Sequence, residues 1–596
     1  MKKFFKLKNP VVYLCFIYLF IGVLWINIIP FNNTSGDCKA PDEWVHYGYN
    51  VKFLIENKRL PISGQDDLDL IKSGRENLLG KVQAIYSYNI YPQFNYIVSA
   101  FFAVILHYFF KINYEIGSRY AGIFWGIIYI IFLYHIISSI EKNKYKATII
   151  TACFCFVPQI IFISSYTNQD IHSLAISSIL VYTFMKLSSE INNESLNKIT
   201  IIKFALACAL LLVSKLNYII YIPFIGSYLI WLCFLKKRMH LKQIFRMLIT
   251  IIAIPMALSG FWYIRNKLLY NDFIGQKYLL NEMSKYTPFG AEQRFNIDTL
   301  IFFIKNSFFF SIFSSAIAGF ENMNLWLNES IYFILLILTL ISWIFISCNL
   351  IENKDFEMIR YQMILFLFIL GTLLLIIVNS IKYDYQPQGR YMFPAVVPTA
   401  MFMAAYINKY PAFFKYMKIT LSMVVFLLIM STNLLIKTYA TYELVPYKIE
   451  GVKQTEASMH IFNVMNEEVS QEFIANKQNL TEIDLNVATF KKEKQVGSIN
   501  ILLIENKSGK MVASQEYNLE NVLDNSLLAF KFMPINDSLN KRYTILIKSY
   551  SSDINNKLTF YASNNDVFPE FDTRVNGKSL KQDIWFVSYY RPENYK

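Results

Sequence analysis

The sequence lacks the cysteines that an extracellular disulfide framework would need. It has seven cysteines in 596 residues, and six of them fall in hydrophobic runs, where packing is their ordinary role. Those six are Cys15, Cys153, Cys155, Cys208, Cys233 and Cys348. Only Cys38 is expected on the oxidising side of a membrane, so we expect no intrachain disulfide.

Acidic residues are also few. Asp and Glu number 43 against 57 Lys and Arg, a formal net charge of +14 at pH 7. Hydrophobic residues make up 54% and aromatic residues 17% of the chain, and the mean hydropathy is +0.32. These values are typical of a polytopic membrane protein. The lysines lie between apolar runs, as the positive-inside rule expects, so the basic excess does not indicate a nucleic-acid partner.

No small-residue cleavage site follows the first apolar run, residues 11–30, which four lysines between Met1 and Lys8 precede. We therefore expect an uncleaved span with a cytoplasmic N-terminus and a first extracytoplasmic loop over residues 31–118. Ten further runs are long enough to be spans. They are 119–140, 147–165, 171–188, 200–214, 217–235, 247–265, 331–350, 360–380, 391–407 and 419–437. An odd total of eleven places the C-terminal part outside.

Two more apolar segments, 89–111 and 297–320, are not counted as spans. Counting the first as a crossing would move the basic cluster Lys142, Lys144 and Lys146 to the outside, against the positive-inside rule. We expect both segments to be re-entrant or juxtamembrane helices that pack against protein and leave on the side they entered.

The stretch Ala40–Asn50 places two carboxylates and a histidine directly beside the membrane. Proline is tolerated in a first helical turn and acids there complement the helix dipole, so we expect a helix to start at Pro41. Asp42 and His46, four residues apart, would share one face, with Glu43 beside them. Such an interfacial helix would lift the acids toward water. The plainer reading is a loop helix whose acids are only solvated.

The expected topology brings further polar groups to the outer face. They lie in Asn168–His172, Ser214–Asn217, Arg265–Asn266 and Tyr383–Tyr391. Three of these groups are cations on the outer side, where the positive-inside rule makes cations uncommon: Lys215, Arg265 and Arg390. Snorkelling to lipid headgroups would explain each one singly. Beside one acidic cluster, however, they fit a phosphate site that faces a carboxylate base.

The character of the chain changes from about residue 445. Short hydrophobic runs alternate with polar residues at Ile499–Ile504, Leu528–Phe532, Tyr543–Ile547 and Leu558–Tyr561. About eight short strands in a jelly-roll-like β-sandwich are expected. Trp585 and several tyrosines would suit stacking on sugar rings, although core packing is the plainer reading. We thus expect a transmembrane domain over 1–442 and an extracytoplasmic all-β domain over 443–596, with carbohydrate binding as one role for the latter.

Five motifs occur in the order found in GT-C superfamily membrane glycosyltransferases. They are Pro41-Asp42-Glu43 with His46, Tyr91–Tyr96 (YPQFNY), Asn168-Gln169-Asp170, Trp262–Asn266 (WYIRN) and Gln388–Pro394 (QGRYMFP). The chain most resembles a bacterial GT-C-like branch with a PDE-x-x-H first loop and a GRYxxP motif. Asp524-Asn525 followed by Phe530–Ile535 resembles the β-sandwich often attached to that branch. The resemblance covers nearly the whole chain.

The resemblance implies a GT-C-type fold and the transfer of a sugar, with inversion, from a polyprenyl-phosphate donor to an acceptor outside the cytoplasmic membrane. It implies Asp42 as the catalytic base, with Glu43 supporting it or binding a metal. The groups expected to bind the donor phosphate are Arg390 first, then Lys215 and Arg265, with Tyr391 beside them.

The same resemblance implies residues that orient the acceptor, namely His46, Asp170, Asn168 and Tyr96. Glu43, Asp170 and His46 are candidate ligands for a divalent cation, Mg or Mn. Related first loops often read His-Pro-Pro before the aromatic pair, whereas this chain has Tyr91 and Gln93 in place of the histidine and the second proline. One metal ligand is therefore missing, which puts a metal requirement in question.

Two readings from other classes stay open. One is a transporter or flippase of envelope glycolipids, whose outer charges would receive a headgroup. Such folds often have paired halves with interrupted helices, and the sequence has no such pairing. The other is a non-catalytic envelope scaffold. For the enzyme, the expected partners are membrane lipids, a polyprenyl-phosphate-linked sugar and a glycan, lipid or protein acceptor, at the bacterial cytoplasmic (inner) membrane.

Overall fold

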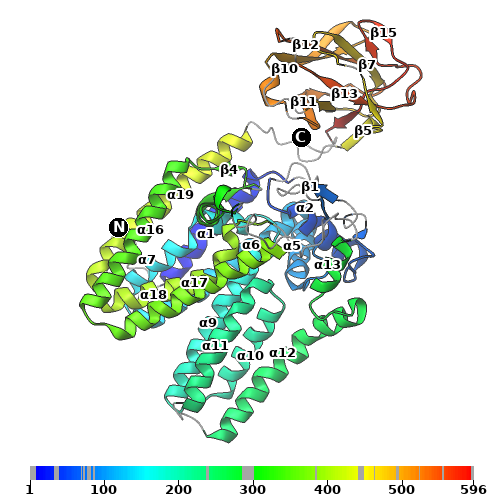
Figure 1. Cartoon of the computed structure of the whole chain (residues 1–596). Coiled ribbons are helices and arrows are strands. Elements are labelled where there is room, and N and C mark those ends of the chain that lie inside the picture. The colour runs from blue at the N-terminus through cyan, green and yellow to red at the C-terminus, as the bar shows by residue number, and fades with distance from the viewer. Residues whose placement is uncertain are drawn as a thin grey trace. The chain divides into compact units, whose positions relative to one another are not determined.

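The chain divides into two compact units, Met1–Tyr442 and Glu443–Lys596 (Figure 1). The computed structural model describes residues 9–31, 39–68, 70, 74–76, 82–84, 87–235, 240–284, 301, 303–321, 323–382, 385–440, 449–461, 463–490, 496–522, 524–553 and 556–591. Cys38, Tyr383 and Asp384 lie outside these ranges.

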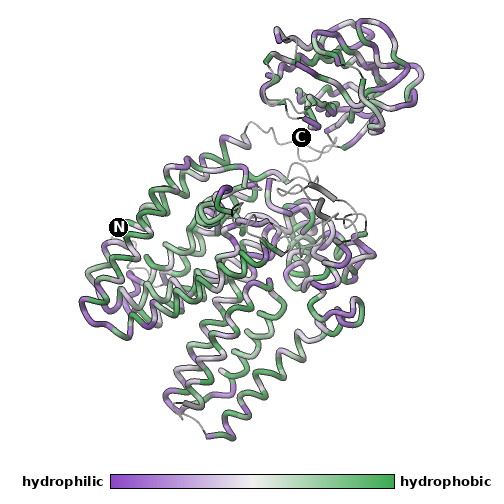
Figure 2. Tube along the Cα trace, in the orientation of Figure 1, coloured by the Kyte–Doolittle hydropathy of each residue, from purple (hydrophilic) through white to green (hydrophobic). Residues whose placement is uncertain are grey.

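The first unit is built mostly of long apolar helices. Within the described residues, eight are long and apolar enough to cross a membrane. They are α1 (Pro10–Ile28), α6 (Tyr114–Ile140), α9 (Asp170–Asn192), the run Leu216–Cys233, α12 (Leu241–Tyr270), α16 (Glu329–Glu352), α17 (Phe356–Lys382) and the run Pro411–Tyr439, which contains α19 (Phe414–Ala440). Figure 2 shows hydrophobic residues along most of their length. Large apolar side chains point outward, such as Leu241 and Leu268, exposed by 76% and 80%. Lipid, rather than water, suits such a surface, and the protein is a polytopic helical membrane protein.

Three of the eleven expected spans differ from a straight crossing. The span expected at 147–165 is a pair, α7 (Lys144–Cys155) and α8 (Pro158–Ser164), bent by 67°. Proline lacks an N–H and clashes with the preceding turn, so it favours a break, and Pro158 is the first residue of the second helix. Counted as one span, it raises the total to nine. At the other two positions α10 (Lys198–Leu212) and α18 (Val396–Lys409) have only 15 and 14 residues, fewer than a crossing needs.

Both segments that we excluded from the spans contain shorter apolar helices. They are α5 (Phe94–Phe110), with 17 residues, and α15 (Phe308–Ala318), with 11. Their re-entrant or juxtamembrane position stays a prediction. The run Leu216–Cys233 lies within η3 (Leu216–Ile220), α11 (Tyr221–Ile230) and η4 (Trp231–Leu235), and the run Pro411–Tyr439 starts with η7 (Pro411–Phe413). The unit also contains α13 (Gln276–Ser284) and two small antiparallel sheets, β1 (Gly74–Glu76) with β2 (Val82–Ala84) and β3 (Gly319–Phe320) with β4 (Leu325–Trp326).

Helix α6 is central to the first unit, where it packs against α1, α5, α7 and α9. Gly122 lets it approach α8 closely, because a Cβ at this position would collide with the carbonyl oxygen of Ser164. This packing holds the loop that follows α8, residues 165–169, against the start of α6. The loop leads into the acid that opens α9.

The first loop is helical, but the helix begins at Glu43 and not at Pro41. Asp42 has a left-handed backbone, with φ of 56°, and precedes α2 (Glu43–Val45). The helix continues as a π-helix, η2 (His46–Lys52), and then as α3 (Phe53–Asn57). The expectation of a start at Pro41 was therefore wrong, since a left-handed residue cannot continue a right-handed helix. π-Helical turns occur often at functional sites, where they re-aim side chains.

The segment that carries Arg390 is a 3-10 helix, η6 (Gly389–Ala395), seated on α15. A Cβ at Gly389 would collide with the backbone of Ala316, and the Gly389 amide donates a 2.7 Å hydrogen bond to Ser315 Oγ. Only glycine therefore allows this close approach. The contact fixes the backbone position of the next residue, Arg390.

The described residues of the second unit are mostly β, as expected, and form twelve strands where about eight were expected. Two antiparallel sheets share one core, with strand orders β10-β9-β12-β7-β14-β15 and β5-β16-β8-β13-β6, β11 pairing with β8. The longer strands are β7 (Glu468–Ile474), β8 (Leu480–Ala488), β9 (Ser498–Glu505), β10 (Lys510–Asn518), β11 (Ser526–Ile535) and β12 (Arg542–Tyr550). The others are β5 (Ile449–Gln454), β6 (Met459–His460), β13 (Thr559–Ala562), β14 (Arg574–Val575), β15 (Lys578–Ser579) and β16 (Phe586–Tyr590), with a single 3-10 turn, η8 (Leu519–Asn521).

The pleat of the central strands explains their pattern. In β12, Tyr543, Ile545 and Ile547 are buried while their neighbours are less so, as a period of two requires. The strands β6, β14 and β15 have two residues each, too few to carry such a pattern.

Candidate active site

Four charged side chains meet at one end of the first unit. Asp42 lies in the loop after α1, Asp170 is the first residue of α9, Lys215 follows α10, and Arg390 lies in η6 after α17. We call these four residues the charged cluster. Its members come from positions 42 to 390 of the chain, so it forms only when the helix bundle is assembled.

Arg390 is the centre of the charged cluster. Its Nη2 lies 3.5 Å from Asp42 Oδ2 and its Nη1 lies 3.5 Å from Asp170 Oδ2. Nη1 also donates a 3.1 Å hydrogen bond to the hydroxyl of Tyr166. The residue is only 4% exposed, and its Nε has no hydrogen-bond partner in the part of the chain that the structure describes. Buried donors without an acceptor are rare in folded proteins, so this atom calls for a partner such as a water or a ligand.

Lys215 completes the cluster from the other side of Asp170. Its Nζ donates a 2.6 Å hydrogen bond to Asp170 Oδ1 and lies 4.5 Å from the centre of the Tyr391 ring. Burial lowers the pKa of Lys215, and the Asp170 carboxylate partly opposes this shift. Asn168 holds the backbone at Asp170, because its side-chain oxygen accepts a 2.7 Å hydrogen bond from the Asp170 amide.

His46 lies beside the cluster as a neutral ring. Burial lowers its pKa to about 4, although Asp42 raises it in part, so the imidazole carries no proton charge at neutral pH. Its Nδ1 is 2.6 Å from the hydroxyl of Tyr96, and its ring stacks on Tyr88 at 4.5 Å. The cluster therefore holds two positive and two negative charges, and His46 adds none.

Asp42 is the most accessible member of the cluster. Its side chain is 34% exposed, compared with 24% for Lys215 and 5% or less for the other two. The hydroxyl of Tyr88 donates a 3.1 Å hydrogen bond to Asp42 Oδ2. Both residues have positive φ angles, 56° for Asp42 and 67° for Tyr88. Two left-handed non-glycine residues in contact are costly, and such strain is concentrated at functional sites.

Two of the charged residues expected at the site lie outside the charged cluster. Glu43 is buried and forms an ion pair with Arg119, with Nη2 and Oε2 2.6 Å apart. Arg265 donates a 2.6 Å hydrogen bond to the carbonyl oxygen of Pro61 and stacks over Trp262. Sequence reasoning missed Arg119 and Tyr88. An arginine at the edge of an apolar run was the available signal for Arg119, and nothing in the sequence marks Tyr88.

The residues proposed as metal ligands do not fit a resident divalent cation. Glu43 is held by Arg119 and by the Thr167 amide, and Asp170 is held by Lys215 and Arg390. Both carboxylates are thus already neutralised by nearby cations. Among the described residues, no group of three or more His, Cys, Asp or Glu side chains could hold a metal ion.

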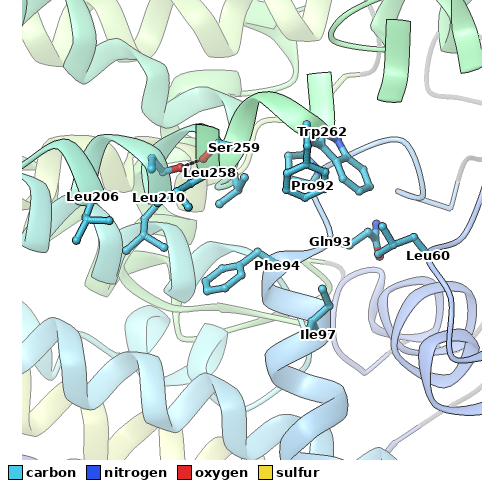
Figure 3. Close-up of a pocket in the computed structure, with 13 residues that line it drawn as sticks. Leu60, Pro92, Gln93, Phe94, Ile97, Leu206, Leu210, Leu258, Ser259 and Trp262 are labelled. Atoms are coloured by element: carbon cyan, nitrogen blue, oxygen red, sulfur yellow. Dashed lines mark hydrogen bonds between the residues drawn. The ribbon is translucent and has the colours of Figure 1, made fainter. Parts of the chain in front are cut away.

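An apolar cavity of about 420 Å³ lies between the start of α5 and the helices α10 and α12 (Figure 3). It is lined by Leu60, by Pro92, Gln93, Phe94 and Ile97 around the start of α5, by Leu206, Ala209, Leu210 and Val213 of α10 and its cap, and by Leu258, Ser259, Phe261 and Trp262 of α12. The segment 88–96 contacts both regions. Tyr88 and Tyr96 hydrogen-bond to Asp42 and His46, and Pro92, Gln93 and Phe94 between them line the cavity.

Comparison with known proteins identifies no family. A scan against protein-family models gives no match. A search of curated proteins gives none either. Several solved structures are weakly similar, all with TM-scores below 0.4. ArnT from Cupriavidus metallidurans bound to undecaprenyl phosphate has a TM-score of 0.35 and 11% identity, over 66% of this chain and 60% of that one.

Two archaeal structures give similar values. The Archaeoglobus fulgidus oligosaccharyltransferase in complex with Zn and sulfate has a TM-score of 0.37 and 14% identity, over 73% of this chain and 53% of that one. The AglB oligosaccharyltransferase of the same organism, in complex with an inhibitory peptide and a dolichol-phosphate, has a TM-score of 0.35 and 14% identity, over 72% and 56%. The matched region spans less than two thirds of each of these chains. Likeness at this level identifies neither a substrate nor a mechanism.

Proposed function

We propose that the protein is a GT-C-type membrane glycosyltransferase that transfers a sugar, with inversion, from a polyprenyl-phosphate donor to an acceptor outside the cytoplasmic membrane. The observation that carries this proposal is the contact between Asp42 and Arg390, which brings a partly exposed carboxylate beside a buried guanidinium at the end of the helix bundle. A general base and an anion-stabilising group are the two groups that such a transfer needs, and their contact must open so that the sugar can lie between them.

Asp42 is the proposed base. An acceptor hydroxyl is a poor nucleophile until its proton is being removed, and a carboxylate within hydrogen-bond reach removes it. Among the acids of the cluster, only Asp42 combines exposure with a fixed orientation, which the hydrogen bond from Tyr88 supports. Asp170, at 1% exposure, is too enclosed to meet an acceptor from solution.

Arg390 and Lys215 are the proposed phosphate ligands, with Tyr391 packed against both cations. The leaving group is a lipid phosphate whose negative charge grows as the bond to the sugar breaks. Arg390 offers an unpaired Nε and a fork that suits phosphate oxygens. Since the cluster is neutral as it stands, a bound phosphate would compete with Asp42 for Arg390 and release the carboxylate for its role as base.

The apolar cavity supports a donor with a hydrocarbon chain. Its lining is almost wholly apolar, and Val213 in its wall lies two residues before Lys215 in the chain. Burial of a prenyl chain there would favour binding by about 25 cal/mol per Å² of apolar surface. Ser259 adds no polarity, because its hydroxyl donates to the carbonyl oxygen of Ala209.

The remaining expected residues take supporting roles in this proposal. Asp170 and Asn168 hold Lys215 and Arg390 in place, and the neutral pair His46–Tyr96 lines the acceptor side. Arg265 is proposed to hold the loop at Pro61, next to the cavity wall at Leu60. We further propose a bacterial cytoplasmic membrane location, a cytoplasmic N-terminus and an extracytoplasmic second unit that could bind the glycan acceptor.

The experiment is a donor panel. Purified protein would be incubated with a series of polyprenyl-phosphate-linked sugars and acceptors, with and without chelator, and released lipid phosphate measured. The proposal expects release from at least one donor, coupled one to one with glycosylated acceptor, and no loss on chelation. Movement of intact donor across proteoliposomes without release would instead indicate a transporter. A panel without release or product would refute the enzyme assignment.

A further inference from the structure

The buried ion pair of Glu43 and Arg119 lies outside the charged cluster but contacts the loops that carry both of its acids. Arg119 is fully buried and uses every N–H of its guanidinium. Nε and Nη2 donate to the two oxygens of Glu43, at 2.8 and 2.6 Å. Its other donors reach the carbonyl oxygens of Ile26, Ile29 and Pro30 at the end of α1. Arg119 therefore fastens the end of α1 to the start of the first-loop helix.

Glu43 extends the same network to the second acid. Its Oε1 also accepts a 2.9 Å hydrogen bond from the amide of Thr167, three residues before Asp170. The hydroxyl of Thr167 lies 2.7 Å from that of Ser118, next to Arg119 on α6. One carboxylate thus connects the backbone beside Asp42 to the loop that leads into Asp170.

The position beside Glu43 is the one that needs support. Asp42 is held in a left-handed conformation, which is costly for a residue with a side chain and persists only where the surroundings impose it. Its carbonyl oxygen accepts bonds from the amides of Val45 and His46, so the turn is fixed on its helical side. The ion pair fixes the adjacent residue from the protein interior.

We propose that Glu43 and Arg119 form a positioning pair that sets the separation of Asp42 and Asp170 on the two sides of Arg390. This proposal rests on the proposed function and assigns to Glu43 neither a catalytic nor a metal-binding role. Both oxygens of Glu43 face Arg119, and the side chain is 4% exposed, so no substrate atom reaches it. A misplacement of about 1 Å at a reacting group can lower turnover about 100-fold, which gives the pair a measurable effect on rate.

The test is a double-mutant cycle on turnover. Glu43→Gln leaves the buried charge of Arg119 unpaired, and the expected result is about a 100-fold fall in kcat with the donor KM within about 3-fold. In the Arg119→Gln background, Glu43→Gln is expected to lower kcat by less than about 5-fold, because the ion pair is already absent. An equal loss of kcat in both backgrounds would mean that Glu43 acts directly on substrate, and would overturn the proposal.

A matched control separates positioning from general destabilisation. Asp355 is likewise a buried carboxylate that accepts hydrogen bonds from a cation and a backbone amide, those of Lys409 and Met358, and the 27-residue helix α17 separates it from Arg390. Asp355→Asn is expected to lower the melting temperature less than Glu43→Gln does, because Lys409 is 46% exposed, and to leave kcat within about 3-fold. A 100-fold loss of kcat in this control would overturn the proposal.

A second measurement does not depend on activity. Amide hydrogen exchange of the full-length wild type and of Glu43→Gln would be compared in peptides over 39–50 and 163–172, with α16 as the reference. We expect exchange about tenfold faster in Glu43→Gln than in the wild type in both peptides, and unchanged in the reference helix. Unchanged exchange would refute the positioning pair even if transfer is observed, and faster exchange in a protein without transfer activity would refute only the proposed function.

Discussion

Asp42 and Arg390 are 348 positions apart in the chain, and their side chains meet with Oδ2 and Nη2 separated by 3.5 Å. The same guanidinium lies 3.5 Å from Asp170, so one cation is shared by two carboxylates. With Lys215 paired to Asp170, the cluster is electrically balanced. An anion that binds to Nη2 of Arg390 competes with Asp42, which links anion binding to the release of the carboxylate.

Arg390→Lys is expected to lower kcat/KM for the lipid-linked donor by about 100-fold or more, because lysine cannot reproduce the fork that stabilises a phosphate in the transition state. Arg265→Lys is the matched control, since Arg265 bonds to a loop carbonyl oxygen outside the cluster. Arg265→Lys should lower kcat/KM for the donor by less than about 5-fold. Steady-state kinetics of lipid phosphate release would check both, and a larger loss at Arg265 would contradict the assignment.

The buried imidazole of His46 makes stability depend on pH. Its pKa falls from 6.5 to about 4 on folding, because burial outweighs the pull of Asp42. Between these values the unfolded chain binds a proton that the folded protein does not, so stability is lost as pH falls from 6.5 toward 4. The loss is about 3 kcal/mol at most.

The measurement is thermal unfolding in detergent at pH 7.5 and pH 5, for wild type and for His46→Gln. Other groups titrate in this range, so the difference between the two proteins isolates the histidine. The wild type should lose more of its melting temperature on acidification than the variant does. Equal losses would show that His46 is not held neutral.

Val213→Phe places a larger side chain in the apolar cavity. We expect it to raise KM for a long-chain polyprenyl donor by about tenfold, while a donor with a short prenyl chain is little affected. Ile202→Phe, on the exposed face of α10, is the control and should change KM for neither donor. Kinetics with donors of graded chain length would check this, and an equal effect on both donors would contradict the cavity's assigned role.

Sequence reasoning located Asp170, Lys215 and Arg390 because each lies beside an end of an apolar run, and Asp42 because it lies in the acidic stretch that follows the first run. The end of a span fixes the side of the membrane on which a residue lies, but not its lateral position in the bundle. Arg265 also lies at the end of a run, and only the packing of α12 places it at Pro61, apart from Arg390. Within the described residues, eight helices, or nine with the bent pair, are long and apolar enough to cross a membrane, where eleven spans were expected; α10 and α18 are apolar helices of 15 and 14 residues.

Backbone conformation was the part that could not be predicted. The left-handed angles of Asp42 and Tyr88 arise from tertiary contacts, and neither residue type requires them. Glu43 was grouped with Asp42 because they are adjacent in sequence, whereas the helix that starts at Glu43 turns its side chain inward to Arg119. Adjacent carboxylates therefore came to face opposite directions, one toward the cluster and one toward the core.

The most direct test of the account is the release of polyprenyl phosphate by Asp42→Asn, measured beside its affinity for the donor. Asparagine keeps the size and the hydrogen bond of the side chain but cannot accept the acceptor's proton, so turnover should fall by about 1,000-fold with donor affinity unchanged or improved. Turnover within about 3-fold of the wild type would contradict the central claim that Asp42 is the base.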